Sequence, residues 1–158
     1  MKKLLNVQKW ITVAILSLCV ILFFCPYITI LGESYNPVQL LSAINESGSQ
    51  VRNDATFEVV ITYIIPVILT ALSAFILALK ISIPKSVICM ALNLVSVIIY
   101  AYSINANYFN VRSGDEGIGL IMNLVIAFLG IFLPIITIIL RIIVKALDRK
   151  KDTKELQT

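Results

Sequence analysis

The chain has 158 residues, of which 59% are hydrophobic and only 14% are charged, a balance that lies outside the range of soluble globular domains. The formal net charge is +4. The positions of the basic residues, described below, account for this excess by membrane topology, so it does not indicate binding to nucleic acid. We therefore expect an integral membrane protein whose single domain comprises residues 1–158.

Four segments are long and apolar enough to cross the hydrocarbon of a bilayer as helices, which takes roughly 20 residues each. They comprise residues 10–30, 59–79, 86–102 and 118–144. The first also resembles a secretory signal sequence, but its apolar run is too long and no cleavage site of small residues follows, so we expect an uncleaved span. The sequence predicts an all-α fold, an antiparallel four-helix transmembrane bundle, with an outer loop at residues 31–58 and a tail at residues 145–158.

Basic residues concentrate on one side of this predicted bundle. With both termini in the cytoplasm, eleven of the 13 Lys and Arg residues lie inside, and only Arg52 and Arg112 lie outside. Most of the charged residues in the predicted outer loops are Asp or Glu. This asymmetry follows the positive-inside rule and predicts a multi-pass protein of the cell membrane with a cytoplasmic tail. The composition, rich in Ile and Lys, is typical of a bacterial protein.

Residue types that carry chemistry are scarce in this sequence. It contains no His, which removes the commonest general base and the imidazole metal ligand. Cys19, Cys25 and Cys89 all fall in predicted spans without C-x-x-C spacing, and we interpret them as small packing residues. The sequence has no Gly-rich phosphate loop and no Ser/His/Asp arrangement. We therefore expect no catalysis, no metal and no cofactor.

Small and polar residues recur in the third and fourth spans at alternating spacings of three and four, which places them on one face of each helix. Such faces let membrane helices approach closely and form hydrogen bonds with one another. They could alternatively line a polar pathway for a small solute. The candidate packing or pathway residues are Asn93, Ser96, Tyr100, Asn107, Asn123, Gly130, Pro134 and Thr137.

The depth of these residues can be counted from the cytoplasmic lysines at ~1.5 Å per residue. This count places Asn93 level with Thr137. Pro134 has no N–H for the carbonyl of Gly130, and the hydroxyl of Tyr100 lies at about that depth, so we expect a hydrogen bond between these two groups. No Asp, Glu, Lys or His lies deep in a predicted span, which argues against a coupled transporter.

The first outer loop contains the stretch SYNPVQLLSAINESGS, which has the signals of a short helix. Asn36 is a good N-cap, Pro37 suits the first helical position and Gly48 can end a helix, so the stretch predicts a helix over about residues 37–46. Such a short helix is marginal alone in water, and its apolar face must rest on the bundle, on lipid or on an outside partner. This partner-docking candidate comprises Val38, Leu40, Leu41 and Ile44.

The layout of four spans with a larger first outer loop resembles that of claudins and tetraspanins in span number alone, because the loop lacks their Trp and Cys pair. We expect a non-catalytic protein that acts in the lipid bilayer by contact with a membrane or extracellular protein, or with further copies of itself. Accessory subunits, regulators and immunity-type factors work in this way. The alternative is an oligomeric channel or facilitator for a small solute that uses the polar faces of spans three and four.

Overall fold

The computed structural model describes residues 2–30, 32–46, 55–79, 82–109 and 114–155. Most of these residues are helical, and four helices are long and apolar enough to cross a membrane. In chain order the long helices are α1 (Lys2–Leu22), a helix that runs through Ala55–Ala78, α5 (Ile83–Phe109) and α6 (Ile118–Glu155). They correspond to the four predicted spans, although the first of them differs in position.

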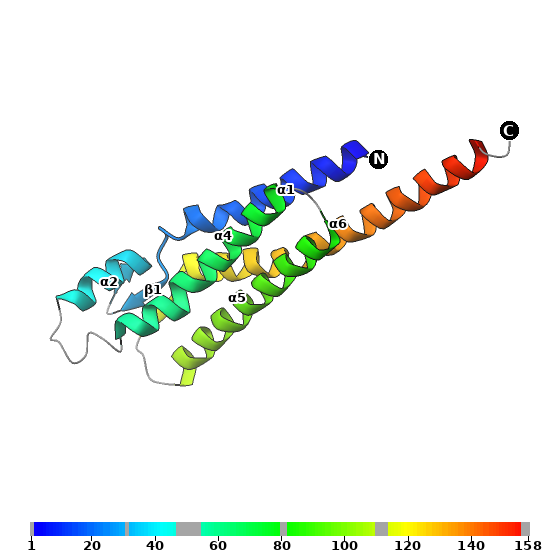
Figure 1. The fold of residues 1–158 in the computed structure, drawn as a ribbon. Coiled ribbons are helices and arrows are strands. Elements are labelled where there is room, and N and C mark those ends of the chain that lie inside the picture. Colours follow the sequence, from blue (N-terminus) through cyan, green and yellow to red (C-terminus); the bar gives the residue numbers. More distant parts are fainter. Residues whose placement is uncertain (1, 31, 47–54, 80–81, 110–113, 156–158) are drawn as a thin grey trace.

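The four long helices pack into one assembly. Helix α1 contacts α4 (Ile65–Ala78) and α6, and helix α5 contacts the same two helices. Figure 1 shows both chain termini at one end of this assembly, and helix α2 with strand β1 toward the other end. Because each long helix packs against at least two others, the faces that meet in the middle are shielded from the surroundings. The core therefore runs along the length of the assembly.

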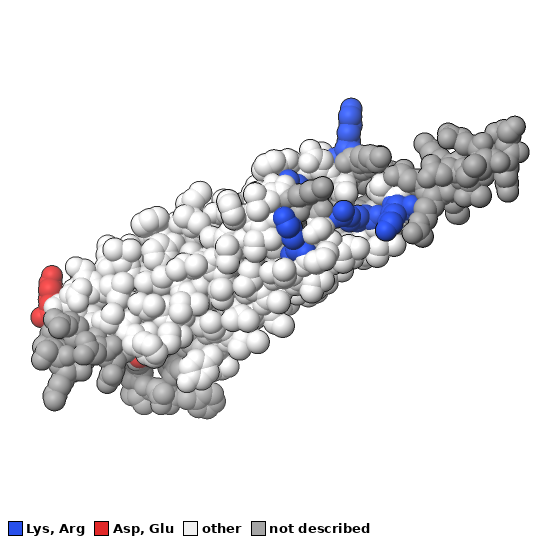
Figure 2. Space-filling model, in the orientation of Figure 1, with Lys and Arg blue, Asp and Glu red and all other residues white. Residues whose placement is uncertain are grey.

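Charged side chains are separated along this assembly. Figure 2 shows Lys and Arg toward the end that holds the termini, and Asp and Glu at the opposite end. The described basic residues of the first end, here called the basic end, are Lys3, Lys9, Lys85, Arg141 and Lys145. The described acidic residues of the opposite end, here called the sheet end, are Glu33, Glu46, Glu58 and Glu116. The two ends therefore carry opposite charge.

The position predicted for the first span, residues 10–30, is wrong. Helix α1 begins at Lys2 and ends at Leu22, and the next residues form a tight turn. Pro26 then prevents a return to helix, because the residue before a proline disfavours the α-helical region. The apolar stretch continues as strand β1 (Ile28–Ile30), whose β-branched side chains favour an extended backbone.

Three short strands form a sheet that the all-α prediction did not include. Strand β1 pairs antiparallel with β2 (Glu33–Tyr35) and with β3 (Gly114–Glu116), in the order β2-β1-β3. Between β1 and β2, Gly32 adopts a left-handed backbone with φ +85°, which glycine tolerates because it has no Cβ. The sheet joins the segment after α1 to the segment before α6, so these two distant parts of the chain lie side by side.

The second long helix contains a short π-helical turn, η1 (Val60–Ile64), directly before α4. Pro66 lies in the first turn of α4. A proline lacks the N–H for the carbonyl four residues earlier, and its ring collides with that carbonyl in a regular α-helix. The wider π turn accommodates the proline without ending the helix, which continues to Ala78.

The helix predicted in the first loop is confirmed as α2 (Pro37–Asn45). Asn36 is its N-cap and accepts a bond from the backbone N–H of Gln39 at 2.9 Å, while the side chain of Gln39 accepts one from the backbone N–H of Asn36 at 3.0 Å. This reciprocal capping box, in which Gln39 was not anticipated, stabilises the start of the helix. The predicted stop at Gly48 lies outside the described residues.

Candidate functional site

A row of uncharged polar side chains lies buried inside the helix assembly. This polar seam comprises Thr12, Thr70, Ser73, Ser86, Asn93, Ser96, Ser103, Asn123 and Thr137. The predicted residues Asn93, Ser96, Tyr100, Asn123, Gly130, Pro134 and Thr137 are all buried there. Asn107 belongs to α5, but its side chain lies outside the part of the chain that the structure describes. Thr12, on α1, was not predicted, because it stands alone in an apolar stretch.

The centre of the polar seam is a hydrogen-bond network between α4 and α5. The Nδ2 group of Asn93 donates to the hydroxyl oxygen of Ser73 at 2.9 Å and to the carbonyl of Cys89 at 2.8 Å. The Ser73 hydroxyl in turn donates to the carbonyl of Leu69 at 3.1 Å. The thiol of Cys89 contacts the carbonyl of Ser73 at 3.4 Å. The amide of Asn93 thus links α5 to α4.

Asn93 also touches helix α6, at Gly130. A β-carbon on Gly130 would lie 2.5 Å from both Cγ and Oδ1 of Asn93, so only glycine leaves room for the amide. The predicted level of Asn93 with Thr137 is therefore wrong by seven residues of α6, or about two helical turns. Long lysine side chains reach the interface from different depths, so they do not mark a common level from which to count.

A second link joins α5 to α4 through Ser96. Its hydroxyl oxygen lies 3.1 Å from the carbonyl of Pro66 on α4 and 3.1 Å from the carbonyl of Leu92 on its own helix. The hydroxyl of Thr70 approaches Ser96 at 3.4 Å. These hydroxyls therefore join α5 to α4 through hydrogen bonds.

A tyrosine cluster closes the polar seam at the sheet end and comprises Tyr27, Tyr63, Tyr100 and Asn123. The Nδ2 group of Asn123 donates to the hydroxyl of Tyr27 and to the carbonyl of Gly119. The ring of Tyr63 meets that of Tyr27 edge-on, with centroids 5.6 Å apart. Burial raises the pKa of the Tyr27 phenol, so this group keeps its proton.

The predicted hydrogen bond from Tyr100 to the carbonyl of Gly130 is wrong. The Tyr100 hydroxyl is buried beside the hydroxyl of Tyr27, away from Gly130, and forms no hydrogen bond of regular geometry with the described residues. Asn93 occupies the place beside Gly130 instead. The prediction failed because it depended on the same depth count that misplaced Asn93.

Tyr27 reaches the cluster because the start of α6 lies directly against the backbone before β1. The N–H of Gly117 donates to the carbonyl of Tyr27 at 2.9 Å, and the N–H of Gly119 donates to the carbonyl of Pro26 at 2.7 Å. A β-carbon on either glycine would lie within 3 Å of that backbone, so neither position accepts a side chain without movement. Sequence reasoning missed Tyr27, and the only signal was the pair of glycines at the start of the fourth span.

No protein-family model, curated protein or solved structure matches this chain. Its function is therefore inferred from its own residues. No group of three or more His, Cys, Asp or Glu that could hold a metal ion occurs among the described residues. Cys19 and Cys89 are buried as free thiols, in agreement with a packing role.

The apolar face of α2 rests partly on the helix assembly. Leu40, Leu41 and Ile44 are half-buried against the core. Val38 is 50% exposed, because it lies at the margin of this face, between Leu41 and Ser42 around the helix. Three of the four candidate docking residues thus pack against the protein itself, and the fourth is exposed.

Proposed function

We propose that this chain is a multi-pass protein of the bacterial cell membrane, folded as an antiparallel four-helix transmembrane bundle with both termini in the cytoplasm. The separation of charge supports this orientation, because the basic end would face the cytoplasm under the positive-inside rule. The sheet end, with α2, would then face outward. Trp10 lies 53% exposed beside Lys9 at the basic end, as expected of an aromatic anchor at a membrane interface.

We further propose that the protein acts by contact with a membrane or extracellular protein, as an accessory subunit, a regulator or an immunity-type factor, and that it is not an enzyme. The carrying observation is that polar groups at the centre of the interior bond to a neighbouring helix, as in the bond from Asn93 to Ser73 and that from Ser96 to Pro66. An interior occupied in this way leaves function to the surface.

The sheet end offers the surface for such a contact. Strand β2 stands at the edge of the sheet, where Glu33 and Ser34 are exposed. Helix α2 adds an exposed face with Val38, Ser42 and Asn45. A partner that binds there would contact polar side chains, one carboxylate and one apolar side chain. The capping box fixes the start of α2, and the sheet fixes β2.

Affinity capture of the full chain from native membranes in mild detergent tests this proposal. We expect a stoichiometric partner protein that is lost in Val38→Asp, while Ser17→Ala, which alters an exposed residue of α1, retains it. Recovery of the chain alone would contradict a stable contact of either kind. Recovery of further copies only would contradict the heterologous contact and indicate homo-oligomerisation.

The alternative is an oligomeric channel or facilitator that uses the polar faces of α5 and α6. One observation favours it, namely that the side-chain oxygens of Asn93 and Asn123 and the hydroxyl of Tyr100 are buried without a protein partner among the described residues. Flux of a small solute into vesicles that contain only this chain would support the alternative. Flux equal to that of empty vesicles would exclude transport by the isolated chain.

A further inference from the structure

Two polar groups of the tyrosine cluster have complementary, unmet hydrogen-bonding needs. Asn123 is 1% exposed and uses its Nδ2 group on Tyr27 and Gly119, while its Oδ1 atom accepts no bond from the described residues. Tyr100 is also 1% exposed, and its hydroxyl, which lies beside that of Tyr27, forms no hydrogen bond of regular geometry with the described residues. An amide oxygen needs a donor and a phenol needs an acceptor, yet these two groups do not bond to each other.

We propose that the tyrosine cluster is a binding site for one internal water molecule. The water accepts the hydroxyl hydrogen of Tyr100 and donates to Oδ1 of Asn123, and the neighbouring Tyr27 hydroxyl supplies a third polar contact. Buried waters typically make two to four such bonds to groups that the protein leaves unpaired. A water molecule offers a donor and an acceptor together, which no apolar occupant can do.

The position of the cluster favours water there over other places in the seam. Asn123 lies in the second turn of α6, which begins at Ile118 at the sheet end, so an aqueous phase at that end is about one and a half helical turns away. Asn93 also has an unpartnered Oδ1, but it packs directly against Gly130 and lies two turns deeper along α5. The tyrosine cluster is therefore the polar site nearer to a source of water.

The bound water connects three separate segments of the chain. Tyr100 belongs to α5 and Asn123 to α6, and Asn123 holds Tyr27 from the segment before β1. One water molecule thus extends the contact between Tyr27 and Asn123 to a third element. This role is independent of whether the protein acts by contact or as a channel.

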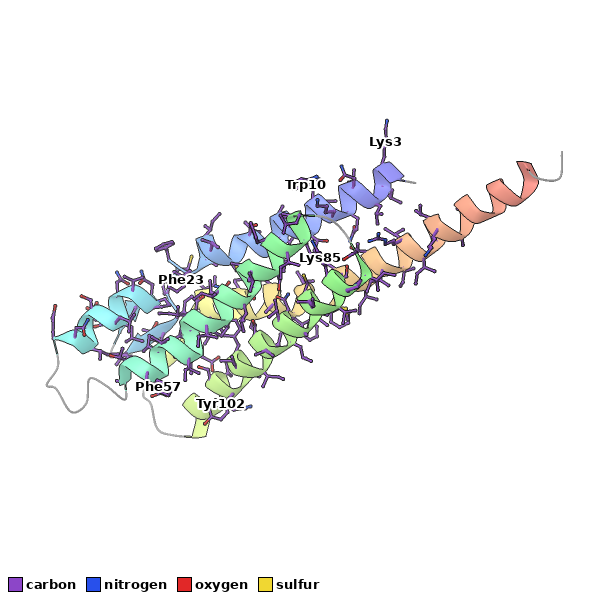
Figure 3. All side chains as sticks on the ribbon, in the orientation of Figure 1. Lys3, Trp10, Phe23, Phe57, Lys85 and Tyr102 are labelled. Carbon is purple, nitrogen blue, oxygen red and sulfur yellow. The ribbon has the colours of Figure 1, made fainter. Side chains whose placement is uncertain are left out.

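The sign of a stability change tests the proposal. In Tyr100→Phe, loss of a hydrogen bond to the water lowers the Tm of the full chain in detergent. If the site is dry, the same substitution removes an unsatisfied buried hydroxyl and leaves the Tm unchanged or raises it. Tyr102→Phe is the matched control, because Tyr102 is 70% exposed on the same helix and points away from the other helices, and it leaves the Tm unchanged (Figure 3).

Direct observation completes the test. A crystal structure that resolves ordered waters, or water-edited solid-state NMR of the Asn123 side-chain amide in bilayers, detects the molecule in the unaltered protein and its loss in Tyr100→Phe. A dry site in the unaltered protein would overturn the proposal. A fall in Tm without detectable water would do so too, because it would indicate a direct bond between Tyr100 and Tyr27.

Discussion

The side-chain amide of Asn93 on α5 occupies the space that a β-carbon on Gly130 of α6 would need. Pro134 lies one turn further along α6 and cannot donate to the Gly130 carbonyl, so both the side chain and one backbone hydrogen bond are missing at this contact. Two helices that would otherwise be kept apart by side chains can approach closely there.

The fit between these two residues predicts that Gly130→Ala destabilises the protein. The added methyl group would force the Asn93 amide away from Ser73 and Cys89, and we expect a loss of about 1–3 kcal/mol in the free energy of unfolding. Thermal unfolding in detergent measures the effect. In an Asn93→Ala background the added methyl group meets no amide, so the double variant should recover most of the loss. Additive losses would contradict the fit.

The network around Asn93 predicts that Asn93→Leu lowers stability by on the order of 1 kcal/mol, because the bonds to Ser73 and Cys89 are lost. Asn105→Leu is the matched control, since Asn105 is exposed on the same helix. A variant of Asn93 that unfolds normally but loses function would instead favour the polar pathway.

Helix α2 predicts two separable effects. Replacing the half-buried Leu41 and Ile44 together with Ser should lower the Tm or the yield of folded protein, because both side chains pack toward the core. Replacing the exposed Val38 with Ser should leave the Tm unchanged and weaken the capture of a partner. If the double variant keeps its Tm but loses the partner, the half-buried face is the docking surface. If neither variant changes either property, α2 has neither role.

The charge separation predicts the topology of the chain in the membrane. Reporter fusions after Asn45 and after Leu156 should report opposite sides, with the second in the cytoplasm, because the basic residues gather at the end that holds the termini. Fusions that report the same side would contradict the three spans expected between these two points, and with them the four-span topology.

Local signals made α2 and the buried faces predictable, whereas contacts between distant segments were not. The N-cap Asn36 and the proline after it act within a few residues, and alternation of three and four identifies a helix face without knowledge of its partner. The contact of Tyr27 with Asn123, by contrast, joins residues 96 positions apart, and the pair of glycines shortly before Asn123 does not by itself identify the partner segment. The same holds for the Asn93 and Gly130 pair, because an apolar sequence does not encode how far one helix slides along another.

The pairing of β1 with β3 has a consequence for how the protein is made. Strand β1 leaves the ribosome early, but its partner strand and helix α6 are synthesised only after two further long helices. Until then Tyr27 lacks both its amide donor and the Gly117 N–H, and one edge of β1 remains open. The sheet can therefore be completed only after the segment before α6 has been made, and a chain that stops before this segment would leave one edge of β1 unpaired.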